Sequence, residues 1–226
     1  MIRLEHIRRA YVSDEVETIA LADINLDVDS GEFLAIMGPS GCGKSTLLNT
    51  LGTVDRPSSG RYWFDNNDLA IRDEAALARF RAETLGFVFQ SFNLIDELTI
   101  EENVELGLAY RRDGRADRRR RVAEAMDRVG ISHRARHYPN QLSGGQQQRA
   151  AIARAIVGDP KLILADEPTG NLDTENGLQV MEILGSLNAE GATIVMVTHS
   201  PSHADMARRR IDMLDGRIVA SVARAI

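Results

Sequence analysis

One stretch, Gly38 to Thr46, restricts the fold of this chain more than any other. It reads Gly-Pro-Ser-Gly-Cys-Gly-Lys-Ser-Thr, the pattern in which glycines allow backbone amides to close around nucleotide phosphates. An apolar run over Phe33–Met37 precedes it, and the Leu-rich residues 47–51 follow it. We therefore expect the loop to join a strand to a helix, so that the phosphates lie at a helix N-terminus, where unpaired N–H groups favour anions.

Every position of this loop is a candidate binding residue. Lys44 is expected to place a positive charge on the outer phosphates, and Ser45 to offer a hydroxyl ligand to Mg²⁺. The other positions supply backbone amides or fill the turn: Gly38, Pro39, Ser40, Gly41, Cys42, Gly43 and Thr46. We interpret Cys42 as a small residue in a tight turn, because thiol reactivity requires exposure and a lowered pKa. A plain glycine-rich turn with a surface lysine is the alternative, and the flanking strand and helix argue against it.

The composition indicates a cytoplasmic protein with a large core. The chain has 226 residues, of which 43% are hydrophobic, enough for one domain or for a core with a subdomain. No apolar run approaches the roughly 18 residues of a membrane-spanning helix. The chain begins without an apolar signal segment, and its single cysteine excludes an internal disulfide framework. A net charge of −6 argues against general nucleic-acid binding, which requires a basic face.

The first third of the chain is predicted to be β-rich. Residues 2–7 and 24–28 alternate apolar and polar side chains at period two, the pattern of a half-buried strand. Residues 60–64 are predicted to form another strand, which ends in a turn at Asn66-Asn67. Asp215-Gly216 near the end of the chain predicts a hairpin.

The middle of the chain is predicted to be helical. Residues 74–84 and 115–129 carry Ala, Arg, Glu and Leu or Val at helical spacing, and few strand signals occur between Gln90 and Pro160. Buried strands return at residues 162–165 and 193–197, whose unbroken apolar character fits a parallel sheet covered on both faces. The expected division is an α/β core over 1–89 and 160–226, with a helical subdomain inserted over 90–159.

A dense cationic stretch lies inside this helical region. Two interpretations are open: a surface that meets a membrane or an acidic partner, and a solvated helix face. The second is favoured because arginine is the usual cation of this chain and Asp113 and Asp117 interrupt the stretch. The residues are Arg111, Arg112, Arg115, Arg118, Arg119, Arg120 and Arg121.

Two acidic residues, Asp166 and Glu167, follow the predicted strand 162–165. Open α/β sheets place their ligands at the carboxyl ends of strands. We expect Asp166 to hold Mg²⁺, and Glu167 to act as the general base that polarises a water molecule. The alternative is an acidic turn before Pro168, which we discount because a phosphate-binding loop is present in the same chain.

A helix is predicted to begin after Ser143, which can cap it, and to end at Gly158-Asp159-Pro160. Gly144 and Gly145 in its first turn expose amides to an approaching anion. With Gln146 they complete the run Leu142-Ser-Gly-Gly-Gln. Here the chain resembles the ATP-binding cassette (ABC) family, whose signature is this sequence.

The resemblance covers essentially the whole chain. It implies an α/β fold with a phosphate-loop NTPase core (a RecA-like, mostly parallel sheet flanked by helices), an N-terminal antiparallel β subdomain and an inserted helical subdomain. It also implies ATP and Mg²⁺ as ligands and a homodimer, in which residues 143–146 of one subunit touch the terminal phosphate bound by the other.

The resemblance also assigns roles to single residues. Tyr11 corresponds to the aromatic residue that stacks on adenine, although Tyr62 and Trp63 are also available. Gln90 corresponds to the glutamine that contacts Mg²⁺ and the attacking water. Asp173 corresponds to the loop that crosses the dimer, and His199 to the switch histidine that contacts the terminal phosphate.

Further details resemble one branch, that of macrolide exporters, lipoprotein-releasing systems and the cell-division ATPase. They are the runs Glu167–Asp173 and Gly86–Leu94 and the helix start Leu47-Leu48-Asn49. This branch implies a permease of few spans with a large extracytoplasmic domain, and a place on the inner face of the cell membrane. Ser200 departs from the family pattern, which often has Asp after the switch histidine.

The leading hypothesis is therefore the ATPase subunit of a membrane complex for export or mechanotransmission. A regulator that drives a cell-envelope hydrolase through a permease-like partner requires the same chemistry and stays open. A soluble cassette of DNA repair or translation is less favoured, because the chain has one cassette, one cysteine and no long heptads. A phosphate-loop kinase or small GTPase leaves residues 142–149 unexplained.

Overall fold

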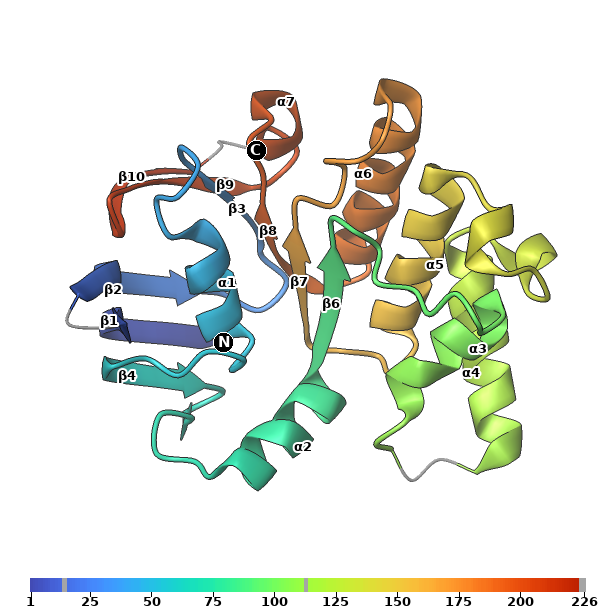
Figure 1. Cartoon of the computed structure of the whole chain (residues 1–226), viewed down its shortest axis with the longest axis horizontal. Helices are drawn as coiled ribbons and strands as arrows, with labels where there is room; N and C mark the ends of the chain where they lie inside the picture. The colour runs from blue at the N-terminus through green and yellow to red at the C-terminus, as the bar shows by residue number, and fades with distance from the viewer. Residues whose placement is uncertain (14–15, 112–113, 224–226) are drawn as a thin grey trace. The chain divides into compact units, whose positions relative to one another are not determined.

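A computed structural model describes residues 1–13, 16–111 and 114–223 (Figure 1). The chain packs into two compact units. Unit 1 comprises Met1–Leu77 and Thr193–Ile226, and unit 2 comprises Ala78–Ala192. The functional division expected from the sequence has other boundaries and stays a prediction.

Unit 1 contains a four-stranded sheet in the order β2-β1-β4-β5. The strands are β1 (Ile2–Ser13), β2 (Val16–Val28), β4 (Ser59–Phe64) and β5 (Asn67–Asp68), and all pair antiparallel. Ile2 lies opposite both Val28 and Phe64, so the alternating apolar residues share one buried face. The antiparallel sheet predicted for the first third is confirmed.

The other strands of unit 1 follow the order β10-β9-β3-β8. β3 (Phe33–Met37) pairs parallel with β8 (Thr193–Val197) and with β9 (Arg209–Leu214). β9 and β10 (Arg217–Ala223) form the predicted hairpin, in which Asp215 and Gly216 have φ angles of 46° and 74°. Helices α1 (Lys44–Leu51) and α7 (Pro201–Ala204) follow β3 and β8 along the chain.

In unit 2, β6 (Leu85–Phe89) and β7 (Leu162–Asp166) pair parallel. Among the described residues between Gln90 and Pro160, every regular element is a helix, as predicted. The α-helices in this range are α3 (Ile100–Glu105), α4 (Arg115–Arg128) and α5 (Gly144–Ile156). Before and after it lie α2 (Glu74–Thr84), which starts in unit 1, and α6 (Thr174–Ala189). Short 3₁₀ turns cover Leu106–Leu108, Ser132–Arg134 and Pro139–Gln141.

Helix α5 is the centre of packing in unit 2. Its residues Ala150 to Ala153 are completely buried, and it contacts α3, α4, α6 and β6. The small alanine side chains allow these neighbours to approach closely. The predicted mixed α/β fold, with an antiparallel β part and parallel strands flanked by helices, is confirmed.

Several members of the cationic stretch have partners inside unit 2. Arg111 Nη1 donates to Gly158 O at 2.7 Å, and Arg118 Nη2 donates to Arg111 O at 2.9 Å. Arg120 pairs with Glu124 at 2.9 Å, one turn along α4, an exposed pair that contributes little to stability. The exposed Arg120 fits the solvated-helix interpretation, whereas Arg111 and Arg118 are part-buried and bond to backbone carbonyls. Arg112 lies outside the described residues.

Over the described part of the chain, none of the helices combines the length and the apolar character needed to cross a membrane.

Candidate functional site

The phosphate loop connects β3 to α1, as predicted. Three of its glycines, Gly38, Gly41 and Gly43, have positive φ angles. Gly43 has φ 102°, and a Cβ atom there would lie 2.4 Å from Ala20 O, so both the conformation and the space require glycine. Gly43 also precedes α1 without a side-chain cap. The first amides of α1 are therefore available to a phosphate.

Lys44 lies over the loop that it belongs to. It is 9% exposed, and its Nζ donates to Gly38 O and Pro39 O, each at 2.9 Å. The ammonium charge is therefore held in the same small region as the loop amides, which suits a multiply charged anion. Ser45 is exposed beside it. Cys42 is 4% exposed, as expected for a residue that fills a turn.

His199 lies at the same sheet edge as the phosphate loop. β3 and β8 are parallel neighbours with Ile36 opposite Val197, and Thr198 N donates to Ile36 O at 3.1 Å. The residues that follow these two strands consequently emerge side by side. Ser200 has a structural role here, because its side chain accepts from His203 N and caps α7. A short hydroxyl at this position fits that cap, which also favours Asp.

The three aromatic candidates for adenine stacking are in different environments. Tyr62 is 2% exposed and donates to Leu51 O at 2.7 Å, and its burial raises the pKa of its hydroxyl. It is a core residue and has no free face. Trp63 lies beside the guanidinium groups of Arg3 and Arg61, each 5.8 Å from its ring centroid. Tyr11 is 39% exposed.

Tyr11 lies on the strand next to the one that contacts the phosphate loop. It is paired with Thr18 across the β1–β2 ladder. Two residues further along β2, Ala20 lies against Gly43 of the phosphate loop. The structure therefore places Tyr11 near the loop within unit 1.

Gln90 and Glu167 lie at one edge of unit 2. Each follows a strand of the parallel pair β6–β7, in which Phe89 is opposite Asp166. Gln90 Nε2 donates to Asn171 Oδ1 at 3.2 Å, and Asn171 Nδ2 donates to Gln90 O at 3.1 Å. Glu167 has φ 47°, a conformation that non-glycine residues seldom adopt and that is frequent at functional sites.

The start of α5 has the predicted cap. Gln146 N donates to Ser143 Oγ at 3.3 Å, and Ser143 N donates to Gln146 Oε1 at 3.2 Å, which together form a capping box. Ser143 is exposed and Gly144 is half-buried, so the start of α5 is partly open to solvent. Gly145 is buried, so the expectation that its amide is exposed is wrong: Asn176 of α6 packs against it.

Asp173 caps α6 in the same way. Its Oδ1 accepts from Asn176 N at 2.9 Å and its Oδ2 from Asn176 Nδ2 at 2.8 Å. These bonds hold the pKa of the Asp173 carboxyl below its usual value. A Cβ atom on Gly145 would lie 2.1 Å from Asn176 Oδ1. The signature residues and Asp173 are therefore brought together in unit 2, at adjacent helix starts.

The metal candidates all offer oxygen. Ser45 has a hydroxyl, Gln90 an amide oxygen and Asp166 a carboxylate, the hard ligands that Mg²⁺ accepts. Within the described ranges, no cluster of three or more His, Cys, Asp or Glu residues is arranged to hold a metal ion. Mg²⁺ commonly combines one or two such protein oxygens with oxygens of a phosphate.

Sequence reasoning missed two residues of α5 that hold the loop after β6. Gln148 is completely buried, and its Nε2 donates to Phe89 O at 3.3 Å and to Pro168 O at 2.6 Å. Arg154 Nη2 donates to Phe92 O at 2.7 Å, and its Nη1 donates to Asn93 O. Burial removes both side chains from water. For Arg154, this desolvation lowers the pKa of the guanidinium group. In the sequence they are two polar residues of an ordinary helix, so no local signal separates them.

Comparisons with known proteins agree with this geometry. A family model described as "ABC transporter" matches residues 21–170. The chain is 48% identical over 219 residues to "Uncharacterized ABC transporter ATP-binding protein YknY" of Bacillus subtilis (strain 168), across 97% of this chain and 95% of that protein. It is 50% identical over 220 residues to "Macrolide export ATP-binding/permease protein MacB 1/2" of Paracoccus denitrificans (strain Pd 1222), across 97% of this chain but 33% of that protein.

A solved structure is also similar over its full length. It is the "Dimeric structure of a post-hydrolysis state of the ATP-binding cassette MJ0796 bound to ADP and Pi". The TM-score is 0.92 at 43% sequence identity, and the match covers 100% of both chains.

Proposed function

Because this chain belongs to the ABC transporter family and is an ATPase of that family, we propose that it drives a separate membrane permease. The observation that carries this proposal is the similarity to two kinds of relative. One is named as an ABC transporter ATP-binding protein, and the chain spans 95% of it; the other is named as a macrolide export ATP-binding/permease protein, and the chain spans 33% of it. The second name links a cassette of this kind to a permease.

Within unit 1, the phosphate loop and α1 hold the nucleotide. The loop amides and Lys44 bind its phosphates, Tyr11 stacks on adenine, and His199 contacts the terminal phosphate. The support is geometric: the loop and His199 follow neighbouring parallel strands, and Tyr11 lies on the strand paired to the one that contacts Gly43. Each of these groups favours binding of a polyanion with a planar base.

Unit 2 supplies the groups for hydrolysis. Glu167 accepts a proton from the attacking water, and Gln90 orients that water. Gln90 and Asp166 are the residues of unit 2 that would hold Mg²⁺, which neutralises charge on the phosphates when it is bound. Glu167 has a φ angle of 47°, and a catalytic role would account for this rarely adopted conformation.

The signature residues 143–146 act in a second copy of the chain. They present helix-start amides at α5, and Asp173 lies beside them at the start of α6. We assign them to the terminal phosphate held by the partner, so that ATP closes a homodimer and hydrolysis reopens it. The dimeric state named for the similar MJ0796 cassette supports this assignment.

The dimer and the role of Glu167 can be tested together. Glu167→Gln keeps the size of the side chain but cannot accept the proton, so ATP should hold the variant as a dimer while turnover falls by about 10²-fold or more. Size-exclusion chromatography with light scattering, with and without MgATP, measures the dimer. Glu101→Gln, an exposed position in the first turn of α3, is the matched control. A Glu167→Gln variant that stays monomeric under saturating ATP contradicts the proposal.

A hollow in unit 2 supports permease docking. It has a volume of about 290 Å³ and is lined by α2, β6 and α5, including Ala82, Phe87, Phe89 and Arg154. We propose that it accepts a short apolar helix of the permease on the cytoplasmic face of the membrane. The loop after Gln90 borders this hollow through Asn93, which provides a direct route from the docked helix to a hydrolytic residue. Relatives named for macrolide export support export as the work performed. Transmission of motion to an extracytoplasmic domain is the alternative form of that work.

A further inference from the structure

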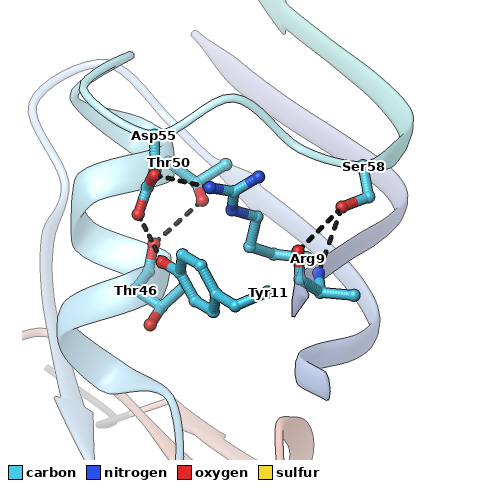
Figure 2. A network of polar contacts seen from close by, with 7 residues as sticks. Arg9, Tyr11, Thr46, Thr50, Asp55 and Ser58 are labelled. Atoms are coloured by element: carbon cyan, nitrogen blue, oxygen red, sulfur yellow. Dashed lines mark hydrogen bonds and ion pairs between the residues drawn. The ribbon is translucent and has the colours of Figure 1, made fainter. Parts of the chain in front are cut away.

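The side chains of Arg9 and Asp55 hold Tyr11 in place. Neither residue has been given a role in nucleotide binding above. Figure 2 shows Tyr11 with Arg9, from the same strand, and Asp55, which follows α1. The Tyr11 hydroxyl donates to Asp55 Oδ2 at 2.5 Å, and Arg9 Nη2 donates to Asp55 Oδ1 at 3.0 Å. The central guanidinium carbon of Arg9 lies 4.4 Å from the centroid of the Tyr11 ring. The three side chains therefore form a closed triangle.

The backbone beneath this triangle is fixed as well. Ser58 N donates to Arg8 O at 2.7 Å. Ala10 N donates to Ser58 Oγ at 3.1 Å, and Figure 2 shows this side chain against the strand. The strand is thus held on both sides of Arg9. The side chains of Arg9 and Asp55 are only 23% and 25% exposed, so water screens their ion pair less than it screens a surface pair.

The triangle restricts the ring of Tyr11 in two ways. The bond to Asp55 fixes the far end of the ring, so the ring cannot turn freely about its first side-chain torsions. The guanidinium covers one face of the ring by a cation–π contact. A planar base can then stack only on the opposite face.

Asp55 also links the triangle to the phosphate loop. Val54 N and Asp55 N both donate to Asn49 O, at 2.9 and 3.2 Å, so Asp55 is held against the end of α1. The same helix begins at Lys44. The surface for the base and the loop for the phosphates are consequently attached to opposite ends of one short helix.

The geometry points to Arg9 and Asp55 as positioning residues that hold Tyr11 ready for an adenine ring. This inference rests on the proposed function, in which Tyr11 is the stacking residue. Arg9 accepts a cost for this position, because its Nε is buried without an acceptor among the residues that the structure describes. A preorganised ring strengthens binding because less side-chain freedom is lost when the base stacks.

The test compares a ligand that contains an adenine base with one that contains phosphates alone. Calorimetric titrations with MgADP and with magnesium pyrophosphate are made on the full chain, since neither ligand is hydrolysed by an ATPase. Arg9→Ala and Asp55→Asn should each weaken MgADP binding by about tenfold, and leave pyrophosphate binding within about twofold. Arg9→Lys, which keeps the charge and the pair with Asp55, should restore part of the loss.

Arg8→Ala is the matched control. It removes the neighbouring arginine, which pairs with Glu17 at 2.8 Å, and should change neither affinity. Equal weakening of both ligands by Arg9→Ala would show a general structural role and overturn the inference. Unchanged MgADP binding in Arg9→Ala would also overturn it.

Tyr11→Ala separates this inference from the proposed function. If the wild-type chain binds both ligands and Tyr11→Ala binds MgADP equally well, the stacking assignment and the inference fail while nucleotide binding stands. If the wild-type chain binds neither ligand, the proposed function itself fails.

Discussion

At the scale of single residues, the pair Gln90–Asn171 shows how one amide can orient another. The carbonyl oxygen of Gln90 can only accept, so the Asn171 atom that faces it must be Nδ2. Asn171 Oδ1 then faces Gln90 Nε2. The side-chain oxygen of Gln90 is therefore turned away from Asn171, and oxygen is the atom that Mg²⁺ prefers.

Asn171→Leu keeps the approximate size of the side chain but removes both hydrogen bonds. We expect the Mg²⁺ concentration for half-maximal ATPase activity to rise by about tenfold, since residues that orient a metal ligand typically contribute this much to affinity. Mn²⁺ binding in the presence of ADP, followed by electron paramagnetic resonance, should weaken in parallel.

The control for this prediction is the double variant. In a Gln90→Ala background, Asn171→Leu should add no further change to the Mg²⁺ requirement. A tenfold effect that persists without the glutamine side chain would mean that Asn171 acts elsewhere.

Residues of this kind mark the limit of sequence reasoning at this scale. The phosphate loop, Glu167 and His199 belong to motifs with fixed spacing. Asn171 lies 81 positions from Gln90, and its contact exists only because two loops fold to one sheet edge. Local sequence carries no information on that pairing.

At the scale of elements, the start of α5 combines two roles in Ser143. It satisfies the amide of Gln146, and in the proposed dimer it faces the phosphate of the partner's nucleotide. The two roles respond differently to substitution, because a carboxylate is also a good helix cap.

Ser143→Ala should lower the free energy of unfolding by about 1 kcal/mol through loss of the cap. Ser143→Asp should retain the stability, but its negative charge should repel the phosphate and prevent dimer formation by the Glu167→Gln variant under ATP. Urea unfolding measures the first effect, and chromatography with MgATP the second. If Ser143→Asp dimerises as well as the serine form, Ser143 does not face a phosphate.

Most helices and strands could be predicted from the periodicity of apolar residues. Their lengths could be predicted less well. The strand predicted at residues 2–7 continues to Ser13 as β1. Arg8, Arg9 and Tyr11 interrupt the apolar alternation there, and irregularities in the register with β2 occur between Leu4 and Ala10. Beyond the buried part of β1, backbone hydrogen bonds to β2 continue the strand. A pattern of apolar residues gives no information on such bonds.

At the scale of the whole molecule, the hollow lined by α2, β6 and α5 is expected to set the coupling to the permease. Ala82→Trp should fill it from α2 and reduce both co-purification of the permease and stimulation of ATPase activity by that partner, with the activity of the isolated chain retained. Ala78→Trp, one turn earlier on α2 and outside the hollow, is the control. Loss of partner binding in both variants would indicate a general effect on α2.

The architecture as a whole was predictable because its motifs occur in a fixed order along the chain. The alternation of strands and helices, the inserted helical stretch and the terminal hairpin all follow from local pattern. The division into two packed units could not be predicted, because it depends on which residues contact one another and not on which elements they form.

The contact between Gly145 and Asn176 also has a consequence for how such chains can diverge. A side chain at position 145 would overlap Asn176, with 2.1 Å to its Oδ1, so a larger residue there is tolerable only if position 176 becomes smaller. The two positions should therefore vary together among homologues, and changing one alone should be deleterious in a way that the second change rescues. Substitutions at positions 145 and 176 would then depend on each other. A smaller residue at position 176 would have to appear before a larger residue at position 145 could be tolerated.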